Sequence, residues 1–181
     1  DGIGNVNYNY ISLATLRDKV PEIEPRKEIE TVDKPIIFSL TINANYKYVY
    51  ETLIDSSQKS KWLRGVTNIK FNEERIHRIG SSHECIIPVG NLLFETLEDY
   101  EDNDKRIYTE FSNGSFLSPP FYENYIIEKQ AEKTTHVQVA LHMHGKGIQK
   151  LLQKPIAKAF KKAMFRFKNI CEGKALTLQR P

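Results

Sequence analysis

The sequence predicts an α+β domain in which a curved antiparallel sheet of about seven strands wraps around a long C-terminal helix, with two short helices after the first strand. Three observations support this prediction: an alternating apolar segment at 36–42, a series of strand-like segments separated by short turn sequences, and an amphipathic segment at 148–171. The chain has 181 residues, a size that suits one domain with an attached tail. Hydrophobic residues make up 40%, which is typical of a folded chain.

The first expected elements are a strand and two short helices. In residues 36–42 apolar side chains alternate along one face, the pattern of a half-buried strand. Asn45 stands where the N-cap of a helix is expected, and residues 46–54 carry apolar side chains at helical spacing. A second short helix is expected over 56–62.

Six further strands are expected between these helices and the C-terminal segment. They cover residues 66–71, 83–88, 91–100, 106–111, 122–129 and 135–144. Turn sequences such as Asn113-Gly114 separate them, and such short connections predict an antiparallel meander.

The last expected element is a helix over residues 148–171. Its apolar residues keep to one stripe through about six turns. Gly173 stands where a glycine commonly ends a helix, and Pro155 is expected to kink the helix. No other segment is long enough to cover the sheet, and a strongly bent sheet leaves space beneath one helix, which favours an apolar ligand site.

The two ends of the chain differ from this domain. Residues 1–33 contain Pro21 and Pro25 among charged residues and are expected to form an extended tether. The domain is expected over 34–173 and a short tail over 174–181. The start at Asp1 rather than Met suggests a piece of a longer protein. No apolar run suits a signal peptide or a membrane helix, and the two cysteines are expected as free thiols, so the prediction is a cytoplasmic protein.

Residues 38–44 (FSLTINA), 49–55 (VYETLID) and Trp62, together with the later pattern at 78–85 (RIGSSHEC), resemble the START-like (SRPBCC) superfamily over about residues 34–172. This superfamily includes birch-pollen-allergen-like and polyketide cyclase/dehydrase-like domains. The resemblance implies a helix-grip fold and binding of lipids, polyketides, hormones or other apolar molecules in a central cavity. The chain is also similar to the subgroup that follows a nucleotide-cyclase-like domain in longer bacterial proteins, which would explain the tether.

The candidate ligand-binding residues are aromatic, sulfur-containing or polar side chains on the expected cavity wall. They are Trp62, His83, Cys85, Phe94, Tyr122, Tyr125, Met143, Phe160 and Met164. For Trp62 the sequence leaves open a cavity wall or a plain core position. His83 and Cys85 share one strand face but are too few to bind zinc, so no metal, cofactor or catalytic residue is assigned.

One set of ionisable residues on an expected strand could serve acid–base chemistry. Arg106, Tyr108 and Glu110 are in phase on one strand, which leaves a buried ion pair open, but the apolar residues between them favour the charged set facing solvent. An enzyme resembling the polyketide cyclases, with pocket residues such as His83, is therefore an alternative that no motif of fixed geometry supports.

The C-terminal helix carries the strongest charge bias in the chain. Between residues 143 and 169 there is no acidic residue, whereas eight are basic: Lys146, Lys150, Lys154, Lys158, Lys161, Lys162, Arg166 and Lys168. This face is expected to be solvated or to contact an acidic partner or membrane surface, and it lacks the aromatic residues of a nucleic-acid platform. The prediction is a domain that binds a small apolar or amphipathic ligand. The alternatives are the enzyme and a non-catalytic regulatory or interaction module of a larger protein.

Overall fold

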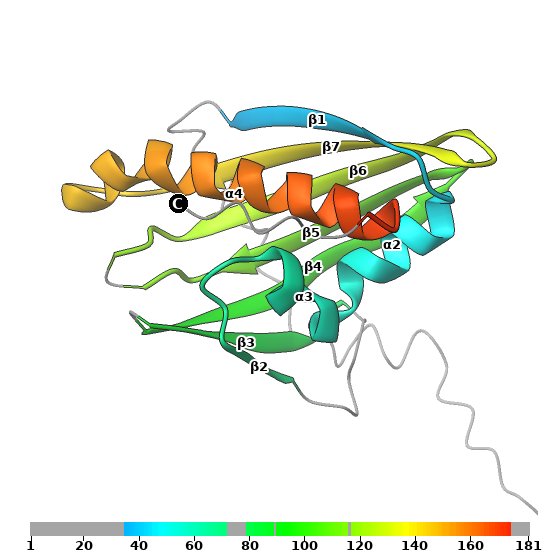
Figure 1. Ribbon diagram of the computed structural model, residues 1–181. Coiled ribbons are helices and arrows are strands. Elements are labelled where there is room, and N and C mark those ends of the chain that lie inside the picture. The colour runs from blue at the N-terminus through cyan, green and yellow to red at the C-terminus, as the bar shows by residue number, and fades with distance from the viewer. Residues whose placement is uncertain (1–34, 72–78, 89, 116, 175–181) are drawn as a thin grey trace, which may run out of the picture. The chain divides into compact units, whose positions relative to one another are not determined.

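The computed structural model describes residues 35–71, 79–88, 90–115 and 117–174, which form one antiparallel sheet with helices over one of its faces (Figure 1). In chain order the elements are β1 (Ile36–Ile42), α2 (Tyr46–Ile54), α3 (Ser56–Trp62), β2 (Asn68–Phe71), β3 (Ser82–Ile87), β4 (Gly90–Asp102), β5 (Lys105–Ser112), β6 (Phe121–Ala131), β7 (Thr134–Met143) and α4 (Ile148–Cys171). This architecture confirms the predicted fold class. The tether expected over 1–33 and nearly all of the expected tail lie outside the described residues, so those boundaries stay predictions.

The sheet contains seven strands in the order β1-β7-β6-β5-β4-β3-β2. Consecutive strands from β2 to β7 are neighbours, as a meander requires, and β1 pairs with β7 so that Ile36 lies opposite Leu141. The register shifts within β4, between Thr96 and Glu98, and near the end of β6. Such bulges increase the local bend and twist of a strand, which helps the sheet to curve around the helix.

Local capping fixes where the helices begin and end. The Asn45 side chain accepts a hydrogen bond from the backbone N–H of Lys47 at 2.9 Å, which confirms the expected N-cap of α2. Gly173 follows α4 with φ of 66°, a left-handed conformation that favours glycine. Its N–H donates to the Ile170 carbonyl at 3.0 Å and closes the last turn. The helix continues through Pro155 as one element, so the expected kink does not divide it.

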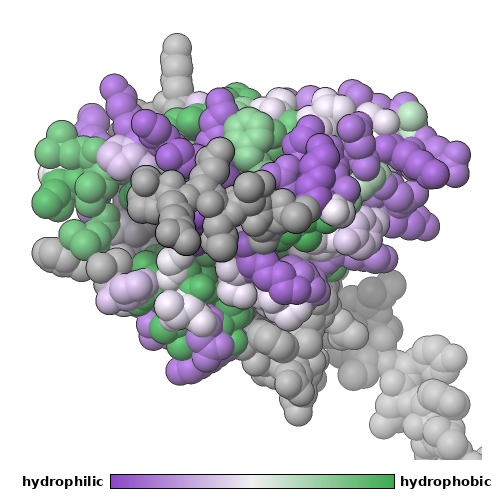
Figure 2. Space-filling view, in the orientation of Figure 1, coloured by the Kyte–Doolittle hydropathy of each residue, from purple (hydrophilic) through white to green (hydrophobic). Residues whose placement is uncertain are grey.

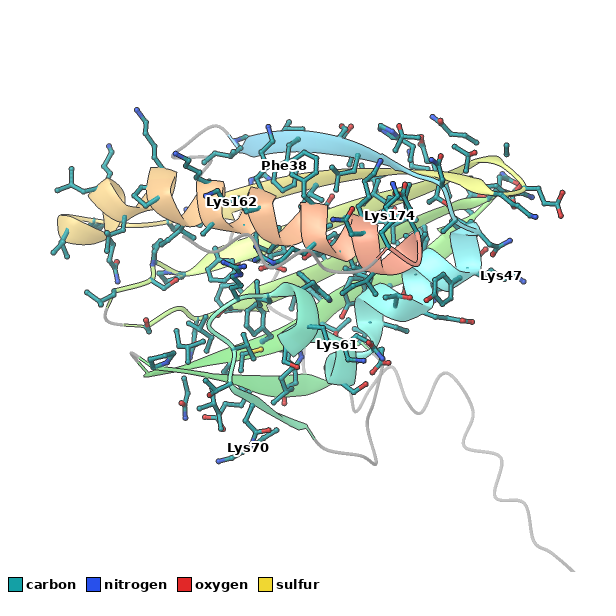
Figure 3. The ribbon with its side chains drawn as sticks, in the orientation of Figure 1. Phe38, Lys47, Lys61, Lys70, Lys162 and Lys174 are labelled. Carbon is teal, nitrogen blue, oxygen red and sulfur yellow. The ribbon has the colours of Figure 1, made fainter. Side chains whose placement is uncertain are left out.

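The core lies between the sheet and the helices. On β7 the alternate residues from Val137 to Met143 are buried, as in a strand with one face in the core. From the helical side, α4 contributes Phe160 and Phe167. Phe38 of β1 lies between that strand and α4 and meets Phe160 edge to face, with ring centroids 6.1 Å apart (Figure 3). This packing places α4 across the concave face of the sheet.

The surface on the helical side is largely hydrophilic, with hydrophobic side chains gathered near the start of α4 (Figure 2). Ile148 and Leu151 in the first turn are strongly exposed, and Leu151 keeps 76% of its surface accessible. None of the helices in the described part of the chain is both long and apolar enough to cross a membrane.

Candidate functional site

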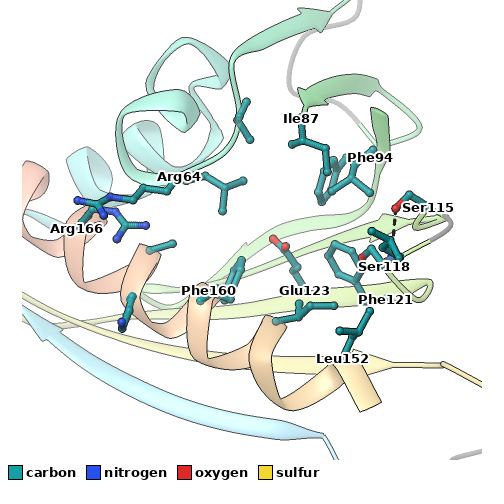
Figure 4. A pocket seen from close by; sticks show the side chains of 18 residues that line it. Arg64, Ile87, Phe94, Ser115, Ser118, Phe121, Glu123, Leu152, Phe160 and Arg166 are labelled. Atoms are coloured by element: carbon teal, nitrogen blue, oxygen red, sulfur yellow. Dashed lines mark hydrogen bonds between the residues drawn. The ribbon is translucent and has the colours of Figure 1, made fainter. Parts of the chain in front are cut away.

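A pocket of about 490 Å³ lies between α4 and the curved sheet. Its wall is built from α4, the segment that follows α3, the strands β3, β4 and β6, and the loop between β5 and β6 (Figure 4). Most of the side chains in this wall are apolar, among them Leu63, Val66, Phe94 and Ile156. The arrangement therefore offers a small molecule a largely apolar site.

The helix leaves room for the pocket because it presents small residues there. Ala159 and Ala163 are one turn apart on α4 and both line the pocket, beside Phe160. Ala163 is buried and Ala159 is exposed, and a larger side chain at either lining position would take up pocket volume. The volume of the pocket therefore depends in part on these two alanines.

The loop between β5 and β6 forms one edge of the pocket. Ser115 donates its N–H to the Ser118 carbonyl at 2.8 Å, and the Ser118 N–H donates to the Ser115 hydroxyl at 3.2 Å (Figure 4). Gln149, in the first turn of α4, donates its amide to the Ser115 carbonyl at 3.2 Å. Gly114 has φ of 73°, and a Cβ added there would lie 2.4 Å from the Ser118 carbonyl oxygen, so the tight turn requires glycine.

Glu123 places a carboxyl group in this apolar wall. It is 4% exposed, faces the helices from β6 and lines the pocket. The Tyr125 hydroxyl donates a hydrogen bond to Glu123 Oε2 at 2.5 Å. Burial, together with the negative charge of Glu110, raises the pKa of Glu123 to about 7. This carboxyl can therefore take up or release a proton near neutral pH.

A second buried cluster joins α3 to β3 and β5. The Lys59 ammonium lies 2.7 and 2.9 Å from the carboxylate oxygens of Glu110 and 2.9 Å from His83 Nε2. The Tyr108 hydroxyl donates to Glu110 Oε1 at 2.7 Å. Burial alone would raise the pKa of Glu110, but the charges of Lys59 and His83 and the hydrogen bonds hold this pKa below its ordinary value. Glu110 is therefore a paired carboxylate, unlike Glu123.

The expectation that the charged set of β5 faces solvent is wrong for Tyr108 and Glu110. Both side chains are buried, because Lys59 of α3 supplies a counter-charge that strand alternation alone does not reveal. The ion pair that the sequence left open does exist, but with Lys59. Arg106 instead pairs with Asp99, its Nε 2.8 Å from the carboxylate.

Some of the candidate ligand-binding residues meet at the pocket. Phe94 and Phe160 line it, and Tyr125 holds the lining residue Glu123. His83 stacks on Phe94, with ring centroids 5.1 Å apart and the planes nearly parallel. His83 thus lies behind the aromatic wall.

The other candidates lie elsewhere. Tyr122 is on the opposite face of the sheet and packs against Phe111, with centroids 4.8 Å apart. Four are buried in the core and are not part of the lining: Trp62, Cys85, Met143 and Met164. The assignment of the nine residues to ligand binding stays a prediction. Within the described residues, no three His, Cys, Asp or Glu side chains are grouped as a metal site.

Sequence reasoning missed three charged residues of this region, Lys59, Arg64 and Glu123, and assigned Arg166 only to the basic face of the C-terminal helix. Two of the missed residues carried a usable signal. Lys59 is three residues before Trp62, so both share one helical face. Glu123 alternates in phase with Tyr125, so both share one strand face.

No protein-family model and no curated protein matches the chain. Solved structures do match it. A hypothetical protein from Helicobacter pylori is 12% identical, with a TM-score of 0.61 over 77% of this chain and 88% of its own. A START superfamily protein from Mycobacterium smegmatis is 10% identical, with a TM-score of 0.59 over 78% and 99% of the two chains. Truncated norcoclaurine synthase from Thalictrum flavum is 10% identical, with a TM-score of 0.59 over 82% and 95%.

Structural similarity at 10% or 12% sequence identity shows only that these proteins share a fold. The fold is the START-like helix grip, so the resemblance seen in the sequence is confirmed at the level of the fold. The narrower similarity to the subgroup that follows a nucleotide-cyclase-like domain stays a prediction.

Proposed function

We propose that this START-like domain binds a small apolar or amphipathic molecule in the pocket between the sheet and α4. The observation that carries the proposal is the pocket itself, which measures about 490 Å³ and has a mostly apolar wall. Small-molecule sites in proteins commonly have volumes of about 300–1,000 Å³ and walls of this kind. An apolar molecule entering the pocket removes wall surface from water, which favours binding roughly in proportion to the area covered.

The experiment is native mass spectrometry of the full chain, followed by extraction and mass analysis of any small molecule that co-purifies. Compounds identified in this way, and a lipid library, are then titrated against two variants. Ala159→Trp places a large side chain at a lining position of α4, whereas Lys158→Trp adds the same side chain at the neighbouring position outside the lining, and both positions are exposed. We expect Ala159→Trp to weaken binding at least about tenfold and Lys158→Trp to leave it unchanged. Equal binding by both variants would contradict the proposal.

A second candidate function, proton transfer to or from a bound substrate, is favoured by Glu123. This carboxyl lines the pocket, and its pKa is raised to about 7 by burial and by Glu110. An acid or base is most effective when its pKa is near the working pH. A bound compound should then exchange hydrogen for deuterium in D₂O faster with the wild-type chain than with Glu123→Gln. Equal exchange rates would leave Glu123 without a proton-transfer role.

A further inference from the structure

Three cationic side chains line one side of the pocket. Lys162 and Arg166 are one turn apart on α4, and Arg64 belongs to the segment between α3 and β2. Figure 4 shows Arg64 and Arg166 beside each other, at the end of the pocket away from Phe121. Glu123 is the one acidic side chain among the described lining residues. Among the described lining residues, this end of the pocket therefore carries more positive than negative charge.

The two arginines are close enough to affect each other. Burial, together with the positive charge of Arg64, lowers the pKa of Arg166. Arg166 is also held in place, because its Nε donates to the Trp62 carbonyl at 2.8 Å. In the described part of the chain no carboxylate lies within ion-pair distance of Arg166. An anion placed between the two guanidinium groups would relieve their repulsion.

The guanidinium of Arg166 keeps donors for such an anion. Its Nε donates to the Trp62 carbonyl. Among the described residues, its two terminal nitrogens have no hydrogen-bond partner. A guanidinium with two terminal N–H groups pointing the same way matches the two oxygens of a carboxylate. The half-buried position strengthens such a contact, because solvent screens it less.

The opposite end of the pocket is mostly apolar. Ile87, Phe94 and Phe121 line this end, beside Ser115 and Ser118, which hydrogen-bond to each other (Figure 4). Figure 4 shows the Glu123 carboxyl pointing into the pocket between this apolar end and the arginines. When Glu123 is charged, it repels an anionic group placed deep in the pocket, and the head group is kept among the arginines.

We infer that the pocket selects amphipathic anions, with a carboxylate head held by Arg64, Arg166 and Lys162 and an apolar chain extending toward Phe94 and Phe121. This inference rests on the proposed function, because it names the ligand class of the same pocket. A neutral molecule of the same shape fills the apolar end but brings no negative charge to the cationic end.

The test compares three ligands with the same eight-carbon chain: octanoate, 1-octanol and octylammonium. Trp62 is the single tryptophan of the chain and directly precedes the lining residues Leu63 and Arg64, so its fluorescence reports binding. A thermal shift provides a second readout. We expect octanoate to bind at least about tenfold more tightly than 1-octanol, and octylammonium to bind most weakly. Raising the salt concentration should weaken octanoate binding and leave 1-octanol binding nearly unchanged.

Variants that each remove one positive charge test where the carboxylate head of octanoate binds. Arg64→Gln and Arg166→Met should each weaken octanoate binding about tenfold without changing 1-octanol binding. Lys162→Met should weaken octanoate binding a few-fold, whereas Lys161→Met, at the adjacent exposed position outside the lining, should have no effect. Arg166→Met can fail to fold, because the Trp62 carbonyl loses its donor. In that case the octanoate affinities of Arg64→Gln and Lys162→Met provide the test.

The possible results distinguish the preference for anions from the proposed binding of a small molecule in the pocket. Equal affinity for octanoate and 1-octanol, unaffected by the variants, would overturn the anion preference and leave pocket binding intact. The same affinity loss in Lys161→Met and Lys162→Met would show attraction by the whole helix and would also overturn it. If the wild-type chain responds to none of the three ligands, the inference fails together with the proposed function.

Discussion

Lys59 of α3 and Glu110 of β5 form a buried ion pair, with the ammonium 2.7 Å from one carboxylate oxygen and 2.9 Å from the other. Their side chains are only 4% and 2% exposed. The pair fixes the short helix α3, which contains one large apolar residue, Trp62, to the middle of the sheet. Burial alone would raise the pKa of Glu110, but the charge of Lys59 helps to hold this pKa below its ordinary value, so Glu110 is a carboxylate in the interior behind the pocket.

Removing one member of this pair should destabilise the domain strongly. We expect Lys59→Met to lower the free energy of unfolding by about 3–5 kcal/mol, because Glu110 is then left buried without its cation. The control is Lys105→Met, which breaks the exposed pair with Glu128 and should cost less than about 1 kcal/mol. Urea unfolding measures both. The double variant Lys59→Met/Glu110→Leu should recover most of the loss, and equal losses in both single variants would contradict this interpretation.

Glu123 should make stability fall as the pH rises. Its pKa is about 7 in the folded chain, raised by burial and by Glu110, against 4.5 for an ordinary glutamate. The folded state therefore holds a proton that the unfolded state has lost between about pH 4.5 and 7, so stability decreases across this window. Glu123→Gln cannot ionise and should be more stable than the wild type above pH 7 by about 3 kcal/mol. Urea unfolding at pH 5 and pH 8 tests this, and a constant difference at the two pH values would refute it.

Phe167 and Phe165 should differ sharply in their contribution to stability, although both are on α4. Phe167 is fully buried and meets Trp62 edge to face, with ring centroids 5.5 Å apart, whereas Phe165 is 48% exposed. Phe167→Ala should cost about 3–5 kcal/mol because it leaves a cavity in the core. Phe165→Ala is the matched control and should cost less than about 1 kcal/mol. Thermal and urea unfolding of the two variants would show the contrast, and similar losses would mean that α4 faces the sheet differently.

Cys85 and Cys171 should be unreactive in the folded chain. Both are free and buried, and burial raises the pKa of each thiol to about 12. Since the thiolate is the reacting form, alkylation by iodoacetamide at pH 8 should be about a thousandfold or more slower than for a free cysteine. Adding urea should release both thiols together, as followed by mass spectrometry. Fast labelling of one thiol without urea would show that its side of the core opens locally.

The fold was predictable because its signals are local. Alternation along β7, the Asn45 cap and the single apolar stripe of α4 each depend on a few neighbouring residues, and each is found in the structure. The order of such elements limits an antiparallel sheet with one long helix to few arrangements. The fold class therefore follows from patterns that a single sequence carries.

The site was less predictable because its residues act through distant partners. Glu110 faces inward only because Lys59, 51 positions earlier, meets it there. Tyr122 and Tyr125 were both predicted to bind the ligand, which shows another limit. Residues an odd number of positions apart on one strand point to opposite faces of the sheet. The pocket also depends on the small side chain of Ala163, and empty volume has no periodic pattern in a sequence.

The pairing of β1 with β7 has a consequence for the chain as it is synthesised. Ile36 leaves the ribosome before its partner Leu141 exists, and at roughly 5–20 residues per second the wait is on the order of 5–20 s. During that interval β1 is an apolar strand without its neighbour, and α4 emerges later still. The curved sheet can close around α4 only after translation has passed α4, so this domain is open to chaperones until that helix has been made.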